Sequence, residues 1–176
     1  GSSTSRGLGD VYKRQPHVYI RFGMWEEILK LGQPEDLTLY VTTNALTYYA
    51  KAVAFANLGK HDKAKKCMLD FSKAFAAVPE SRMLFNNKSR DILKIADEMM
   101  KGEVAFKSGD QPTGLNHLRN AVELDDGLAY EEPWSWPQPT RHALGALLME
   151  AGKYDEAEAV YSCLLYTSDA ADDLLC

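Results

Sequence analysis

The sequence predicts an all-α fold, an α-solenoid of three to four irregular pairs of antiparallel helices. Three observations predict it: apolar residues recur at helical spacing along most of the chain, four segments repeat one helix–turn–helix pattern, and a glycine separates the two helices of each pair. The composition agrees, since 45% of the 176 residues are apolar and 26% are charged, as is usual for a globular protein. We therefore expect no β-sheet.

The repeated pattern is anchored on four glycines, each of which follows an apolar-periodic helix: Gly23, Gly59, Gly109 and Gly152. Five positions after each glycine stands a small or apolar residue: Ile28, Ala64, Gly114 or Ala157. Glycine takes the left-handed conformation that ends the first helix, and the residue five positions later lets the second helix pack closely against the first. This spacing predicts helices near 41–58, 61–77, 89–108, 112–124, 139–151 and from 154 onward.

The first pair, over residues 16–31, is incomplete, because only the end of its first helix is present. The loop GQPEDLTL (32–39) joins it to the second pair, and either Asp36 or Thr38 could cap the helix that follows.

Two longer segments separate the later pairs. Residues 76–90 mix turn residues with three apolar side chains that we expect to cover a helix edge: Met83, Leu84 and Phe85. Residues 125–140 contain three prolines and two tryptophans, and the prolines exclude a continuous helix.

The glycine-centred pattern resembles the tetratricopeptide repeat, a unit of about 34 residues that forms two antiparallel helices. The segment ALLMEAGKYDEAEAVY (146–161) carries the resemblance best, and AFANLGKHDKAKKCM (54–68) follows the same order of residue types. The resemblance covers most of residues 16–162. It implies a scaffold module that binds a protein or peptide, as part of a longer array of the bacterial type.

The two ends of the chain do not share the repeat pattern. SRGLGDVYKRQ (5–15) and CLLYTSDAADD (163–173) resemble in-frame translations of the two strands of a transposase-based sequencing-library adapter. We therefore expect three regions: a non-native tag and adapter-derived segment (1–15), a helical array from a truncated metagenomic reading frame (16–162) and an adapter-derived tail (163–176). We expect the tail to extend the last helix and to add apolar cover through Leu164, Leu174 and Leu175.

Solenoids usually bind partners on their concave face. The resemblance places the inward-facing positions of each first helix on that face, and these positions hold His17, Ile20, Tyr49, Val53, Met99, Glu103, Phe106, His142 and Met149. The segment 125–140 adds three candidate contact residues: Trp134, Trp136 and Arg141. Either this segment folds over the mouth of the groove and contacts the ligand, or its tryptophans cap the edge of the core.

Two other interpretations stay open. The chain could bind a small ligand or a metal through His17, Glu103 and His142, although these residues come from separate repeats and lack metal-site spacing. Alternatively, the segment 125–140 fills the groove, which then has only a structural role. We expect no enzymatic activity, because the chain contains no catalytic motif, and we expect no cofactor and no bound metal.

The expected partner is a peptide or protein. The net charge of −5 disfavours nucleic-acid binding, and no run of about 18 apolar residues is present to span a membrane. Pairing of two copies through the truncated ends is a further alternative. The compartment is left open between cytoplasm and periplasm.

Overall fold

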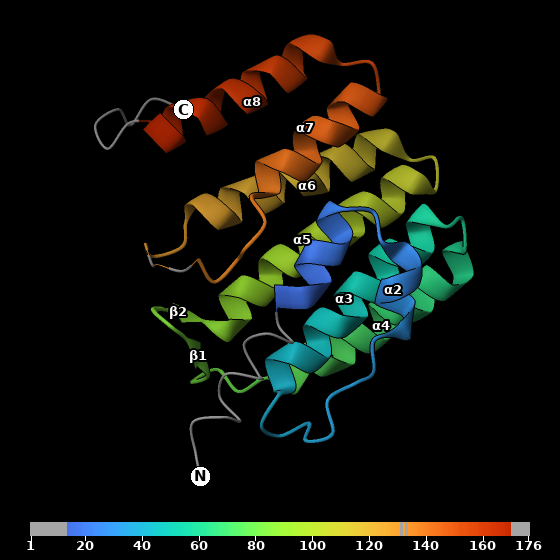
Figure 1. The fold of residues 1–176 in the computed structure, drawn as a ribbon, viewed down its shortest axis with the longest axis vertical. Coiled ribbons are helices and arrows are strands. Elements are labelled where there is room, and N and C mark those ends of the chain that lie inside the picture. Colours follow the sequence, from blue (N-terminus) through green and yellow to red (C-terminus); the bar gives the residue numbers. More distant parts are fainter. Residues whose placement is uncertain (1–13, 131, 133, 170–176) are drawn as a thin grey trace.

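A computed structural model of the chain describes residues 14–130, 132 and 134–169. A helical segment over residues 14–21 is followed by α2 (Trp25–Lys30), α3 (Val41–Asn57), α4 (His61–Ala76), α5 (Ser89–Lys107), α6 (Gln111–Asp126), α7 (Thr140–Glu150) and α8 (Tyr154–Asp169). Figure 1 shows α3–α4, α5–α6 and α7–α8 as successive antiparallel pairs that stack side by side. The predicted all-α solenoid is confirmed.

The six predicted helices correspond to α3 through α8, and every predicted boundary that can be compared lies within two residues of the observed one. The N-cap residue of α3 is Tyr40, and no side chain caps this helix, so the prediction that Asp36 or Thr38 caps it is wrong. Asp36 instead closes the turn before α3, because its carboxylate oxygen accepts hydrogen bonds from the backbone N–H groups of Thr38 and Leu39, both at 2.9 Å.

The four glycines form the same turn in all four pairs. Their φ angles are 63°, 69°, 98° and 74° at Gly23, Gly59, Gly109 and Gly152, in the left-handed region that only glycine adopts without strain. Two backbone hydrogen bonds recur at each turn; at Gly59, for example, the glycine N–H binds the carbonyl of Ala56 and the next N–H binds that of Phe55. These bonds satisfy carbonyl groups that the helix end would otherwise leave free.

The residue five positions after each glycine is buried, as predicted, at Ile28, Ala64, Gly114 and Ala157. Among the glycines, the closest approach to backbone atoms of another helix is at Gly114, where an added Cβ atom would lie 2.8 Å from the carbonyl oxygen of Gly102. The backbones of α5 and α6 therefore touch with no room for a methyl group. α5 also packs beside α3, whereas α7 packs on α6.

A small hairpin differs from the sequence prediction. β1 (Met83–Leu84) and β2 (Asn87–Lys88) pair antiparallel and form the only sheet among the described residues. Phe85 lies in the turn between the two strands, where its φ of 52° allows the chain to reverse direction. Of the three apolar side chains expected to cover a helix edge, only Leu84 packs against the core, because the hairpin leaves Met83 and Phe85 half exposed.

The segment between α6 and α7 is held at both of its ends. Asp125 accepts hydrogen bonds from the backbone N–H and the hydroxyl of Thr140, and Asp126 forms a two-pronged ion pair with Arg141 at 2.5 and 2.7 Å. Further along, Asn87 makes two hydrogen bonds to the backbone of Ala129, at 2.9 and 2.8 Å. These contacts fix the path of the chain on either side of Trp136.

At its end the structure follows the expected extension of the last helix, since α8 continues to Asp169. Leu174 and Leu175 lie outside the described residues. Within the described part of the chain, no helix combines the length and apolar character needed to cross a lipid bilayer.

We predict that Gly114→Ala lowers the stability of the protein by about 1–2 kcal/mol, because the new methyl group forces α5 and α6 apart and overpacking outweighs the helix-propensity gain of alanine. Urea unfolding measures the change. Gly127→Ala is the matched control, because the nearest atoms to a Cβ there lie at 3.5 Å. Equal stability of the two variants would contradict the close approach.

Candidate functional site

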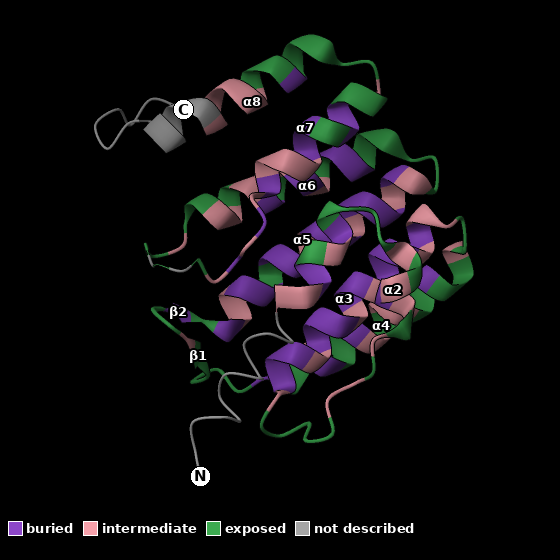
Figure 2. Ribbon diagram, viewed as in Figure 1, coloured by how far each residue is buried: buried purple, intermediate pink, exposed green. Residues whose placement is uncertain are grey.

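The predicted groove positions on α3 and α5 form a covered face. Tyr49 and Val53 on α3 and Met99, Glu103 and Phe106 on α5 are all buried, with Glu103 7% exposed. Figure 2 shows that buried residues concentrate along these two helices. We call these five residues the covered face, since they lie where the sequence predicts an open groove.

The helical segment 14–21 packs against this face through His17. His17 and Ile20, three positions apart and so on one side of the segment, are 4% and 6% exposed. The ring of His17 lies 6.0 Å from that of Tyr49, measured between centroids. In Figure 1 the segment, drawn in blue, lies in front of α5 and beside α3. The sequence resemblance placed His17 and Ile20 in the groove lining, whereas in the structure they belong to the helix that packs against it.

Trp136 also packs against this face. Its ring meets the ring of His17 edge-on at 4.7 Å and lies 5.6 Å from the ring of Tyr49. Trp136 is 3% exposed, although it belongs to a segment with no regular structure. The segment 125–140 therefore reaches the covered face through this tryptophan, and a histidine near the start of the described chain packs against a residue far along it.

The contact between these rings leaves polar atoms unpaired. Among the described residues, Nδ1 of His17, the hydroxyl of Tyr49 and Nε1 of Trp136 are buried without a hydrogen-bond partner, as is the side-chain oxygen of Gln138. Buried polar groups in folded proteins are nearly always hydrogen-bonded, and each exception costs about 1–3 kcal/mol. The cover therefore fits the face through apolar contact but not through hydrogen bonding.

Glu103 is the only buried acidic residue in the described part of the chain. Its carboxylate accepts one hydrogen bond, from the amide of Asn57 at 3.3 Å. Burial raises the pKa of Glu103 from its usual 4.5 to about 7, and the hydrogen bond from Asn57 offsets only part of that effect. Near pH 7 this carboxyl group is therefore divided between its protonated and charged forms.

The neighbouring titratable groups are shifted by the same burial. Desolvation, with help from the charge of Arg14, lowers the pKa of His17 from 6.5 to about 4, so the imidazole is neutral at pH 7. Burial and the negative charge of Glu103 raise the pKa of the Tyr49 hydroxyl well above its usual value. The charge of Glu103 thus acts on the ring that contacts His17.

The remaining candidate residues lie apart from the covered face. Trp134 is 57% exposed and Met149 48% exposed, while Arg141 is engaged in its ion pair with Asp126. His142 is half-buried on α7 and makes neither a hydrogen bond nor a ring contact with His17 or Glu103. Among the described residues, no group of three or more histidine, cysteine or acidic side chains is placed to hold a metal ion.

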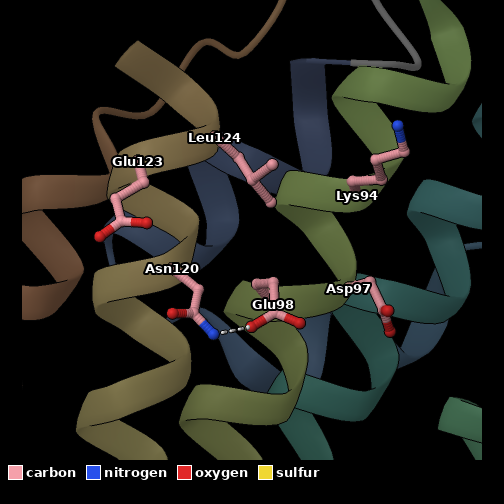
Figure 3. A pocket seen from close by; sticks show the side chains of 6 residues that line it. All are labelled: Lys94, Asp97, Glu98, Asn120, Glu123 and Leu124. Carbon is pink, nitrogen blue, oxygen red and sulfur yellow. Dashed lines mark hydrogen bonds between the residues drawn. The ribbon is translucent and has the colours of Figure 1, made fainter. Parts of the chain in front are cut away.

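A second feature, which the sequence did not indicate, is a depression of about 580 Å³ between α5 and α6. Figure 3 shows the residues that line it: Lys94, Asp97, Glu98, Asn120, Glu123 and Leu124. Its central carboxylate, Glu98, lies 2.8 Å from Nδ1 of His117 and accepts a hydrogen bond from Asn120 at 3.1 Å.

Two of the carboxylates that line this depression, Asp97 and Glu98, are already partnered. Although partial burial acts to raise the pKa of Glu98, hydrogen bonds from His117 and Asn120 hold it below its usual value. Lys101 lies 2.7 Å from Asp97 and 3.7 Å from Glu98. We interpret these contacts as structural, because Glu98 on α5 binds His117 and Asn120 on α6 and so holds the two helices together. These residues stand on two different helices, so no spacing in the sequence could have indicated the cluster.

The comparison with known families identifies the second helix pair. The family model of the tetratricopeptide repeat matches residues 45–72, which lie on α3 and α4. No curated protein and no solved structure matches the chain. The second helix pair is therefore a tetratricopeptide repeat, and its glycine turn recurs in the other pairs.

We predict that Glu103→Gln removes a pH dependence of stability. Because the pKa of Glu103 is higher in the folded state, unfolding releases a proton, and the stability of the wild type falls as pH rises from about 4.5 through 7. Above pH 7 the variant should be more stable by up to about 3 kcal/mol, at about 1.4 kcal/mol per pKa unit. Urea unfolding from pH 4 to 8 measures this.

His17 acts in the opposite direction, because its folded-state pKa is lowered: stability is lost as pH falls from about 6.5 through 4. The two effects oppose each other in the wild type between pH 4.5 and 6.5. The Glu103→Gln variant should therefore gain stability up to about pH 6.5 and then level off. A profile parallel to that of the wild type would contradict the burial of Glu103, and Glu123→Gln, on the exposed side of α6, is the control.

Proposed function

We propose that this chain is a tetratricopeptide repeat scaffold that holds a short helical segment of a protein partner on the covered face of α3 and α5. One observation carries the proposal: a helix, the segment 14–21, packs against the face through His17, whose ring lies 6.0 Å from that of Tyr49, and both His17 and Ile20 of this helix are buried. A surface that packs against one side of a helix has the shape and apolar character to accept another helix of the same kind.

The occupant belongs to the same chain, so a partner must displace it. The local concentration of a segment tethered by a short linker is in the millimolar range, and a free helix at micromolar concentration competes poorly with it unless it binds more tightly. The unpaired atoms of His17, Tyr49 and Trp136 favour displacement, because opening lets them form hydrogen bonds with water.

We propose further that the chain has no catalytic activity. The groups with the most strongly shifted pKa values, His17, Tyr49 and Glu103, are buried, and a catalytic group must reach its substrate. Their shifts follow from desolvation under the cover rather than from an arrangement around a reacting atom. The small-ligand and metal interpretation loses support as well, since His142 lies apart from His17 and Glu103.

We predict that a synthetic peptide of residues 14–31 binds in trans to the full chain that carries Ile20→Asp and binds the wild type at least about tenfold more weakly. A buried aspartate at position 20 loosens the internal cover and frees the face for the peptide. Fluorescence anisotropy gives both dissociation constants, and hydrogen exchange locates the protected amides, which should lie on α3 and α5.

A peptide that itself carries Ile20→Asp is the matched control and should not bind. Leu69→Glu, on the exposed side of α4, should leave binding unchanged. If the Ile20→Asp chain remains folded by circular dichroism, shows fast exchange in residues 14–21 and still fails to bind the peptide, the face does not accept a helix in trans and the proposal is wrong.

A further inference from the structure

The two segments that meet at the covered face are attached to the rest of the chain in different ways. The segment 14–21 is held by packing. Among the described residues it forms no hydrogen bond and no ion pair with α3 to α8, and its one side-chain hydrogen bond joins Gln15 to Tyr19 within the segment, at 2.7 Å. The segment can therefore leave the face without breaking a hydrogen bond to another helix.

The segment 125–140 is held by hydrogen bonds as well as by packing. The hydroxyl of Ser135 donates to the backbone carbonyl of Leu84 in β1, at 3.2 Å, and Asn87 in β2 holds the backbone of the segment through two further bonds. The contacts with the start of α7 hold its other end. Trp136 directly follows Ser135, so the hairpin anchors the chain one residue before the ring that packs on the covered face.

This difference determines which of the two segments moves when the face opens. Hydrogen bonds add to the stability of the segment that they hold, and local opening affects first the segments that are held least. Displacement of the segment 125–140 would break its bonds to both strands of the hairpin, whereas displacement of the segment 14–21 breaks none to another helix. We therefore expect the segment 14–21 to leave and Trp136 to stay on Tyr49.

The rings of His17, Tyr49 and Trp136 form a cluster in which each ring contacts the other two. The centroids lie 4.7 Å apart for His17 and Trp136, 5.6 Å for Tyr49 and Trp136, and 6.0 Å for His17 and Tyr49. All three distances fall in the range of about 4.5–7 Å in which aromatic rings attract each other. When His17 leaves with its segment, Tyr49 and Trp136 keep their contact and leave a place for one further ring.

The place of His17 suits an uncharged ring better than it suits histidine. Burial there disfavours the charged imidazolium and lowers the pKa of His17 to about 4. The neutral imidazole is not matched either, because its Nδ1 atom is buried without a hydrogen-bond partner. A phenyl ring keeps the edge-on contact with Trp136 and has no polar atom to leave unpaired.

We propose that Trp136 is a fixed part of the partner site, and that Trp136 and Tyr49 together select a partner helix with an uncharged aromatic side chain, phenylalanine best of all, in the place of His17. This inference rests on the proposed function and adds the chemistry of the partner. The internal segment offers a histidine at this position, so it is the weaker ligand and gives way to such a helix. Trp136 determines specificity and is not displaced with the segment 14–21.

The test compares three forms of the peptide of residues 14–31, unchanged, with His17→Phe and with His17→Ala, each titrated into the full-length Ile20→Asp protein. The His17→Phe peptide should bind about tenfold more tightly than the unchanged one, because it buries no unpaired nitrogen. The His17→Ala peptide should bind about tenfold more weakly than the unchanged one, because it loses both ring contacts. Fluorescence anisotropy measures all three dissociation constants.

A substitution of Trp136 separates its contribution from that of the rest of the face. In the protein that also carries Trp136→Ala, the preference for His17→Phe over His17→Ala should fall from about a hundredfold to about tenfold or less. Trp134→Ala is the matched control, because Trp134 stands two residues earlier in the same segment and is 57% exposed. With this control substitution the preference should be unchanged.

A second measurement leaves Trp136 intact and follows its position. The chain contains three tryptophans, so Trp25→Phe and Trp134→Phe leave Trp136 as the only one. In the Ile20→Asp form of this chain, the emission of Trp136 should lie at longer wavelength than in the closed form, because one side of its ring then meets water. Addition of the His17→Phe peptide, itself also carrying Trp25→Phe, should return the emission to shorter wavelength.

Each outcome decides the inference. If the three peptides bind with equal affinity, if the preference survives Trp136→Ala in a folded chain, or if peptide binding moves the emission of Trp136 to still longer wavelength, the inference is wrong while the proposed function stands. If no peptide binds to the folded Ile20→Asp protein, the proposed function fails and the inference fails with it.

Discussion

The structure depends on how closely the two helices of each pair approach after the glycine turn. At Gly114 the backbones of α5 and α6 are in contact, so the distance between these helices is fixed by backbone atoms and not by adaptable side chains. Because α5 is held in this way and packs beside α3, side chains from two repeats face the same space. The meeting of Tyr49 with the charge of Glu103 follows from that spacing.

The helices could be predicted from the sequence because their signals are local. The glycine at the turn and the buried residue five positions later lie within one helix pair, and both recur along the chain. The contact between His17 and Trp136 has no such signal, since the two residues are remote in sequence and one lies in an irregular segment. Periodicity shows that one side of a helix is buried, but not which segment buries it. The apolar character of Val53, Met99 and Phe106 was equally compatible with an open groove and with a covered face.

A covered face with only a structural role would be expected to contain apolar residues. At this face the chain instead places a glutamate, a tyrosine, a histidine and a tryptophan, and most of their polar atoms lack a strong partner. Residues that do not suit the packing around them are expected at functional sites, because function rather than stability selects the residue there. The cluster of Glu98, His117 and Lys101 on α5 and α6 differs in this respect. There Glu98 has a partner in both His117 and Lys101.

The internal segment also limits how tightly a partner can bind. The apparent dissociation constant of a partner equals its intrinsic value divided by the fraction of molecules whose face is open. An opening cost of about 3 kcal/mol leaves the face open in about one molecule in a hundred and weakens apparent binding about a hundredfold. The unpaired atoms under the cover lower this cost, because they regain hydrogen bonds on opening.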